Sequence, residues 1–162
     1  MTTIHEGGQV SDAVTTGRVV VGIDDSPAAR QALRYAADIA GWKKWTLHVV
    51  HAWHLSYPAG PYAIDLAEVE LALAEAAREV VTEVEDDVLG QDHGLELRQT
   101  IAEGPAARVL IEESEGADLL VVGSRGRGGF ASLALGSVGQ ACVHHAHCPV
   151  LVVRPRADKK AQ

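Results

Sequence analysis

The sequence predicts an α/β protein built on a single open, doubly wound parallel five-stranded sheet with helices on both faces, a Rossmann-like fold. Short continuous apolar runs, typical of strands buried on both faces, alternate along the chain with segments whose apolar residues repeat at helical spacing. This alternation favours a parallel sheet, because right-handed crossovers place helices on both of its faces. The 162 residues correspond to one domain of ordinary size.

The first strand and the first helix have the clearest boundaries. Residues 18–23 (RVVVGI) form a continuous apolar run, and Ser26-Pro27 starts a helix with Ser at the N-cap and Pro at the first helical position. Apolar residues follow at helical spacing as far as Gly41, which we expect to end this helix. The later strands are expected at 45–53, 95–102, 118–122 and 149–153, and the later helices at 64–89, 104–115 and 136–146.

The helix expected at 64–89 is rich in Ala and Glu. Its acidic residues lie mostly away from its apolar stripe, so we interpret them as a solvated face and not as a metal site. The strand at 95–102 is half polar and is therefore expected near an edge of the sheet. The apolar stripe that should face the core comprises Leu66, Val69, Leu73, Ala77, Val80, Val84 and Val88.

Composition restricts the class of protein. The formal net charge of −8 argues against broad electrostatic binding to nucleic acid or to an anionic membrane. Two cysteines do not make a disulfide framework, and no apolar run approaches the roughly 20 residues that span a bilayer. The polar N-terminus has no apolar region of a secretory signal. We therefore expect a cytoplasmic protein, with one domain at 18–155 between flexible tails at 1–17 and 156–162.

A glycine-rich segment, GSRGRGGFASLALGSV (123–138), carries the clearest chemical signal. Glycine allows positive φ and close approach of a ligand, and successive backbone N–H groups can form an anion-binding concavity. Gly136-Ser137 starts a helix whose N-terminus favours phosphate, and Ser137 can either cap that helix or donate its hydroxyl to a phosphate oxygen. Arg125 and Arg127 add local positive charge. The alternative is a flexible surface loop, because a glycine pattern alone is a weak signal.

The position of this segment favours ligand binding. Ligands of open α/β sheets bind outside the carboxyl ends of the strands, where the strand order reverses. The first strand also ends in a candidate segment, GIDDS (22–26). If the first and fourth strands are neighbours at the reversal, both loops face one crevice.

The spacing of the glycines is more specific than their number. Gly123, Gly126, Gly136 and Ser137 fit the pattern G-x2-G-x9-G-[S/T], and the segments VVVGIDDSPAARQAL, VVHAW, ADLLVVGSRGRGGF and HAHCPVLVVRP accompany it. On these residues, over about 18–155, the chain resembles the ATP-binding subgroup of the universal stress protein family. The resemblance implies a Rossmann-like fold of the adenine-nucleotide-binding type.

The resemblance also implies which residues would meet the nucleoside. Asp24 would lie near the ribose, Gly22 would line the adenine, and Ala52 would meet the adenine through its backbone. The sequence departs slightly from the family pattern, with Asp25 where glycine is common and Gly139 where larger residues often occur. Asp25 would weaken binding by repulsion if it pointed inward.

The phosphates would be held by the glycine-rich segment. Gly123 and Gly126 would pass close to the ribose and phosphates, while Gly136, Ser137 and Val138 would hold the β- and γ-phosphates. A Mg²⁺ ion would be held mainly by the phosphates. The remaining candidate binding residues are Ile23, Ser26, Ser124, Arg125, Arg127, Gly128 and Gly129.

Other chemically suggestive residues have structural interpretations. The Cys and His residues between 142 and 148 lack the paired C-x2-C spacing of common zinc sites. His48 and His54 fall on one face of the second strand and His51 on the other, so the three cannot converge on one metal. His51 is either a packed histidine or a neighbour of the adenine pocket. Ser26 is read as an N-cap and not as a nucleophile, because no G-x-S-x-G elbow surrounds it.

We therefore predict an ATP-binding, nucleotide-dependent stress-response or regulatory protein with no catalytic residue assigned. ATP hydrolysis should be slow at most, because no general base or arginine finger is evident. Alternatives are a binding module for AMP or cyclic AMP, and an ATP pyrophosphatase-type enzyme, whose SGGxDS loop is replaced here by GIDDSPA. The last strand, Val150–Val153, is an apolar edge that invites pairing with another chain, and the resemblance implies a homodimer through it.

Overall fold

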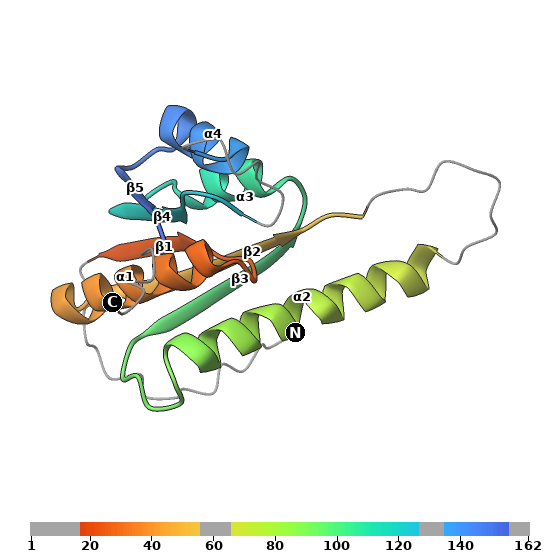
Figure 1. Cartoon of the computed structure of the whole chain (residues 1–162), viewed down its shortest axis with the longest axis horizontal. Coiled ribbons are helices and arrows are strands. Elements are labelled where there is room, and N and C mark those ends of the chain that lie inside the picture. Colours follow the sequence, from red (N-terminus) through yellow and green to blue (C-terminus); the bar gives the residue numbers. More distant parts are fainter. Residues whose placement is uncertain (1–16, 56–65, 127–134, 156–162) are drawn as a thin grey trace, which may run out of the picture.

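The computed structural model describes residues 17–55, 66–126 and 135–155, and in these ranges it has the predicted fold. Five parallel strands form one sheet in the order β3-β2-β1-β4-β5 (Figure 1). The expected tails lie outside these ranges, apart from Gly17. The elements are β1 (Arg18–Gly22), α1 (Pro27–Lys43), β2 (Thr46–Trp53), α2 (Leu66–Val88), β3 (Leu97–Glu103), α3 (Ala106–Glu113), β4 (Leu119–Gly123), α4 (Ser137–His145) and β5 (Val150–Val153).

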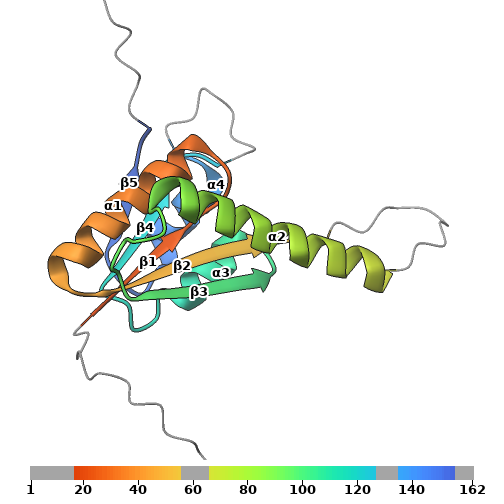
Figure 2. The same cartoon turned by 90° about the horizontal axis from the view of Figure 1, so that it is seen from below.

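The helices form a layer on each face of the sheet. Figures 1 and 2 show α1 and α2 covering one face and α3 and α4 covering the other. Val19 and Val21 of β1 pack with residues of α1 and α2, whereas Val20 packs with Leu110 of α3. All three valines are 0% exposed, so the continuous apolar run of 18–23 is that of a central strand covered on both faces.

The sheet has β3 at one edge and β5 at the other. Arg98 and Gln99 of β3 are exposed, which confirms that the half-polar strand lies at an edge. β5 pairs with β4 alone among the described strands, with Leu120 opposite Val150 and Gly123 opposite Val153. The expected apolar edge strand is therefore present.

The first helix continues past the residue expected to end it. α1 ends at Lys43, and Lys44 takes the left-handed conformation with φ of 59°. The Lys44 N–H and the Trp45 N–H both bond the carbonyl of Ala40, which closes the helix end without glycine. The expectation that Gly41 ends the helix was wrong, because this glycine instead lies inside the helix against Leu95.

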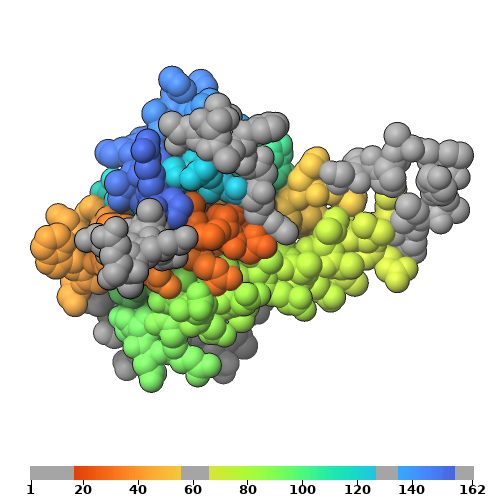
Figure 3. Space-filling model, in the orientation of Figure 1, coloured from red at the N-terminus to blue at the C-terminus, as the bar shows by residue number. Residues whose placement is uncertain are grey.

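The apolar stripe expected along α2 is only partly buried. Of its members, Ala77 and Val84 are buried, but Leu66 is 46% exposed. Val81, which the expected stripe left out, is also buried. A helix of 23 residues is about 34 Å long, whereas the 8 residues of β2 span about 26 Å. The N-terminal part of α2 therefore projects beyond the sheet, as Figures 1 and 3 show, and none of the five described strands lies beneath it.

A buried histidine lies in a polar cluster on the face covered by α3. His48 of β2 is 0% exposed; Arg18 lies 3.0 Å from its Nδ1 and Thr100 Oγ1 2.9 Å from its Nε2. The guanidinium can only donate, so Nδ1 accepts and Nε2 carries the proton. Glu113 lies 3.8 Å from both Arg18 Nη1 and His48 Nδ1. Burial, with the charges of Arg98 and Arg18, lowers the pKa of His48 to about 4.

Within the described ranges, no helix combines the length and apolar character that a membrane crossing requires.

Candidate functional site

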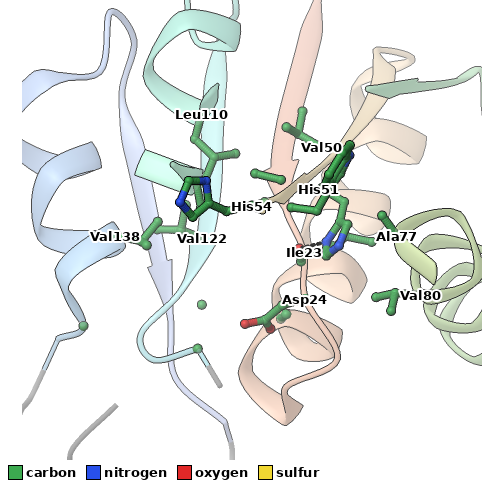
Figure 4. A pocket seen from close by; sticks show the side chains of 18 of the residues that line it. Ile23, Asp24, Val50, His51, His54, Ala77, Val80, Leu110, Val122 and Val138 are labelled. Atoms are coloured by element: carbon green, nitrogen blue, oxygen red, sulfur yellow. Dashed lines mark hydrogen bonds between the residues drawn. The ribbon is translucent and has the colours of Figure 1, made fainter. Parts of the chain in front are cut away.

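A cavity of about 740 Å³ lies at the carboxyl ends of β1, β2 and β4 (Figure 4). Its volume falls in the range of small-molecule sites. Leu73 and Val80 of α2 contribute one wall, and Leu110 of α3 and Val138 of α4 contribute the other. Figure 4 shows Val80 on one side of the strand ends and Leu110 and Val138 on the other.

The cavity occupies the point at which the sheet topology reverses. β1 pairs with β2 on one side and with β4 on the other. β1 leads into α1 and β4 leads into α4, and these two helices lie on opposite faces of the sheet. Their connecting segments diverge and leave a crevice at the carboxyl edge. The first and fourth strands are neighbours, so the condition under which their two loops face one crevice is met.

Asp24 lies where the β1–α1 loop faces the β4–α4 segment. Its Oδ1 accepts the Ser26 N–H at 3.0 Å. Ser26 Oγ accepts the Ala29 N–H at 3.2 Å and donates to the Arg125 carbonyl at 3.5 Å. Ser26 is therefore the N-cap, as predicted, and also links the two loops. Asp25 is exposed and is not among the cavity-lining residues, so it does not point inward.

A hydrogen bond joins the two described ends of the glycine-rich segment. The Gly136 N–H donates to the Ser124 carbonyl at 2.8 Å, and the Ser124 N–H donates to the Val153 carbonyl at 2.7 Å. Ser124 is buried and anchors the segment to β5 rather than lining the cavity. The predicted residues Arg127, Gly128 and Gly129 lie outside the described ranges.

The N-terminus of α4 opens into the cavity. Gly136 is the N-cap, and Ser137 is the first helical residue, so the alternative in which Ser137 caps the helix was wrong. Ser137, Val138 and Gly139 all line the cavity. N–H groups in the first turn of a helix have no partner within the helix and attract anions. The Ser137 hydroxyl adds a donor at the same place.

The space around the backbone differs from one glycine of the site to the next. A Cβ on Gly123 would lie 3.0 Å from backbone and side-chain atoms of Ala28, so this glycine allows α1 to pack against β4. A Cβ on Gly126 would lie 2.8 Å from Asp24 Oδ2, so this glycine admits the carboxylate. A Cβ on Gly136 meets nothing closer than 3.7 Å, which leaves that position open for a larger residue.

The helical residues of the cavity could not be found from a local motif. Leu73, Ala76 and Val80 come from α2, and Ala106 and Leu110 come from α3. They read in the sequence as ordinary core positions. They reach the cavity only because the crossovers place these helices against the carboxyl edge.

His51 also lines the cavity, on the α2 side. It is 7% exposed, and its Nδ1 lies 2.8 Å from the Ile23 carbonyl oxygen. The sequence left open whether His51 is a packed histidine or a neighbour of the binding pocket. The residue is both hydrogen-bonded in the interior and part of the cavity wall.

Most of the predicted binding residues in the described ranges share this cavity. Ser26 and Ser124 lie behind its wall and hold the two loops in place. Those that line it are Gly22, Ile23, Asp24, Ala52, Gly123, Arg125, Gly126, Gly136, Ser137 and Val138.

Cys142 and its neighbours form no metal cluster in the described ranges, where no three His, Cys, Asp or Glu residues group closely enough to hold an ion. Cys142 is 0% exposed in α4, and its pKa is raised to about 11, first by burial and then by Cys148. A thiol with so high a pKa stays protonated near neutral pH and is a poor nucleophile.

Comparison with known proteins relates this chain to the universal stress protein family. Residues 15–154 match the model of the universal stress protein family. A universal stress protein of Mycolicibacterium smegmatis is 36% identical over 138 residues, covering 83% of this chain and 47% of that protein. One from Mycobacterium tuberculosis is 35% identical over 148 residues, covering 91% of this chain and 52% of that protein. The chain thus spans about half the length of these curated relatives.

Solved structures agree with this fold. Universal stress protein UspA from Lactobacillus plantarum has a TM-score of 0.72 at 26% identity, covering 85% of this chain and 97% of that one. A universal stress protein in complex with cAMP has a TM-score of 0.63 at 26% identity, covering 86% of this chain and 98% of that one. The family match over nearly the whole described chain, together with these relatives, shows that the chain belongs to the universal stress protein family.

Proposed function

We propose that the cavity binds ATP, with Mg²⁺ held mainly by the phosphates, and that occupancy of the site regulates the protein. One observation carries the proposal: the ends of three strands and the N-terminus of α4 converge on one cavity of about 740 Å³. Its walls combine apolar surface suited to a purine ring with backbone N–H groups suited to phosphate.

The chemistry of the cavity separates into two parts. Val50, Leu110 and Val138 provide apolar surface for the base, while Ser137 and the first turn of α4 provide donors for phosphate. Asp24, at the boundary, has the acceptor chemistry that ribose hydroxyls require. This division fits a nucleotide better than a wholly apolar ligand.

A second candidate ligand is cAMP. The solved structure in complex with cAMP is 26% identical to this chain and covers 86% of it. A cyclic monophosphate would occupy the base and ribose region and leave part of the α4 N-terminus uncovered. ATP is favoured here because the open position at Gly136 and the hydroxyl of Ser137 extend the donor surface beyond one phosphate.

The proposed activity is binding, with hydrolysis slow at most. Of the described residues that line the cavity, Asp24 is the acidic one, and its Oδ1 already accepts the Ser26 N–H. A general base for water would need an acceptor facing the terminal phosphate.

Calorimetric titration with ATP, AMP and cAMP tests the proposal. We expect ATP to bind most tightly and Gly136→Val to weaken it at least tenfold, because the added methyl groups would cover the first amides of α4. The variant should remain folded, since a Cβ there meets nothing closer than 3.7 Å. Gly123 is unsuitable for this purpose, because its Cβ would strike α1 at 3.0 Å.

Gly41→Ala is a matched control, because Gly41 lies within α1 against Leu95 and does not line the cavity. It should bind ATP as the wild type does. Wild-type protein that takes up none of the three nucleotides, or a Gly136→Val variant with unchanged affinity, would overturn the assignment.

We further propose that the chain forms a homodimer through the β5 edge. The strand is short and apolar, and β4 is its partner among the described strands. An unpaired apolar edge favours pairing with a second chain. Light scattering should give twice the 17.1 kDa of one chain, and a particle of only that mass at micromolar concentration would refute the dimer.

A further inference from the structure

His51 makes a hydrogen bond that fixes how the chain leaves β1. Its Nδ1 lies 2.8 Å from the Ile23 carbonyl oxygen, and Figure 4 shows the ring pointing toward Ile23 at the cavity wall. A carbonyl oxygen only accepts, so Nδ1 carries the proton. Among the described residues, Ile23 is the hydrogen-bond partner of the His51 ring.

The bond anchors the peptide that precedes Asp24. The Ile23 N–H donates to the Val50 carbonyl at 2.9 Å, one residue beyond the last paired residue of β1. Both polar groups of Ile23 are therefore held by β2, its N–H by backbone and its carbonyl by the His51 side chain. The next residue, Asp24, thus starts its turn from a fixed point.

Asp24 contacts its own loop and lies beside the β4–α4 segment. Its Oδ1 accepts the Ser26 N–H at 3.0 Å, and its Oδ2 lies 2.8 Å from the place where a Cβ on Gly126 would be. The carboxylate is therefore fitted between the two loops that form the cavity mouth. A shift of the Ile23 carbonyl would be transmitted directly to this side chain.

We propose that His51 is a positioning residue that holds the Ile23 carbonyl and thereby sets Asp24 for ligand binding. This inference rests on the proposed function for its effect on affinity, but its structural part does not need a ligand. The His51 ring is only 7% exposed, so its two nitrogens are largely removed from water. An apolar side chain would fill the same space without this desolvation cost, which indicates that the hydrogen bond, and not packing alone, is the role of the ring.

Two substitutions of His51 separate its two nitrogens. His51→Asn keeps an N–H donor near the place of Nδ1 and removes Nε2, whereas His51→Gln carries its amide near the place of Nε2 and removes the donor to Ile23. We expect His51→Asn to bind ATP within about twofold of the wild type. We expect His51→Gln to bind roughly three- to tenfold more weakly, the range that corresponds to one lost hydrogen bond.

A double-mutant cycle with Asp24 tests whether the effect acts through the carboxylate. In an Asp24→Ala background, His51→Gln should change the ATP affinity by less than about twofold. A ligand-free readout is the hydrogen exchange of the Ser26 amide, whose acceptor is Asp24 Oδ1. It should speed up several-fold in His51→Gln and stay unchanged in His51→Asn.

The outcomes separate this inference from the proposed function. Faster exchange at Ser26 in His51→Gln alone supports the positioning role even if ATP does not bind the wild type, in which case only the proposed function fails. A loss of affinity in His51→Asn with none in His51→Gln would overturn the inference, because it would indicate direct contact of the ligand with Nε2. Equal losses in both variants would overturn it too, because they would show that the donor at the place of Nδ1 does not matter. Unchanged Ser26 exchange in His51→Gln, or an undiminished loss of affinity in the Asp24→Ala background, would overturn it as well.

Discussion

His48 should make the stability of the protein depend on pH. The folded protein holds the pKa of His48 at about 4, well below its usual value of 6.5, chiefly because the ring is buried and also because Arg98 and Arg18 lie near it. The Arg18 guanidinium donates to Nδ1, so a second proton on the ring would meet a donor. The folded state therefore keeps His48 neutral, while the unfolded chain protonates it near pH 6.5.

The direction and the size of the pH effect on the free energy of unfolding follow from proton linkage. Between about pH 4 and 6.5 the unfolded state binds more protons at His48 than the folded state does. The contribution of His48 to stability is therefore fully present above about pH 6.5 and is lost as the pH falls from 6.5 to about 4. Each pH unit is worth about 1.4 kcal/mol, so the whole window amounts to about 3 kcal/mol. At pH 4.5, most of this contribution, between about 2 and 3 kcal/mol, should already be lost.

Urea unfolding followed by circular dichroism from pH 4.5 to 7.5 measures this loss, with His48→Asn as the reference. Asparagine keeps an acceptor for Arg18 and does not titrate. Burial raises the pKa of Glu85, which contributes in the opposite direction, but this contribution is common to both proteins and cancels in the difference. A difference that stays constant with pH would refute the reasoning, and would indicate that Glu113, 3.8 Å away, stabilises the charged ring.

Three further substitutions separate stability from binding. Ser26→Ala removes the N-cap of α1 and should cost about 1 kcal/mol, a fall in Tm of roughly 3 °C by calorimetry; an unchanged Tm would contradict its capping role. Ser137→Ala should leave Tm unchanged, because Ser137 is not the cap, and weaken ATP binding roughly three- to tenfold; equal titrations of variant and wild type would exclude the hydroxyl as a ligand contact. Gly126→Ala places a Cβ 2.8 Å from Asp24 Oδ2 and should weaken ATP binding about tenfold by moving the carboxylate, whereas full affinity would show that Asp24 is not needed where it lies.

The order of strands and helices could be predicted from local patterns. The run of three fully buried valines in β1 and the Ser26-Pro27 start of α1 carry their own signals, and the structure confirms both. The end of α1 could not be predicted, because the hydrogen bonds to Ala40 depend on the chain turning at Lys44.

The candidate site was predictable where backbone chemistry defines it. The glycine spacing and the GIDDS segment identify the loops, and the reversal of strand order brings them together. The walls from α2 and α3 were not predictable, because Val80 and Leu110 reach the cavity through tertiary packing. Gly123 illustrates a different limit, since its closest contact is the backbone of α1, a reason for glycine that the sequence does not reveal.

A crystal structure of the protein grown with Mg·ATP tests the central claim most directly. The account predicts a polyphosphate against the backbone amides of Ser137 and Val138, with the purine beside Leu110 and the ribose near Asp24. Nucleotide bound elsewhere on the molecule, or a cavity without nucleotide at millimolar Mg·ATP, would contradict it.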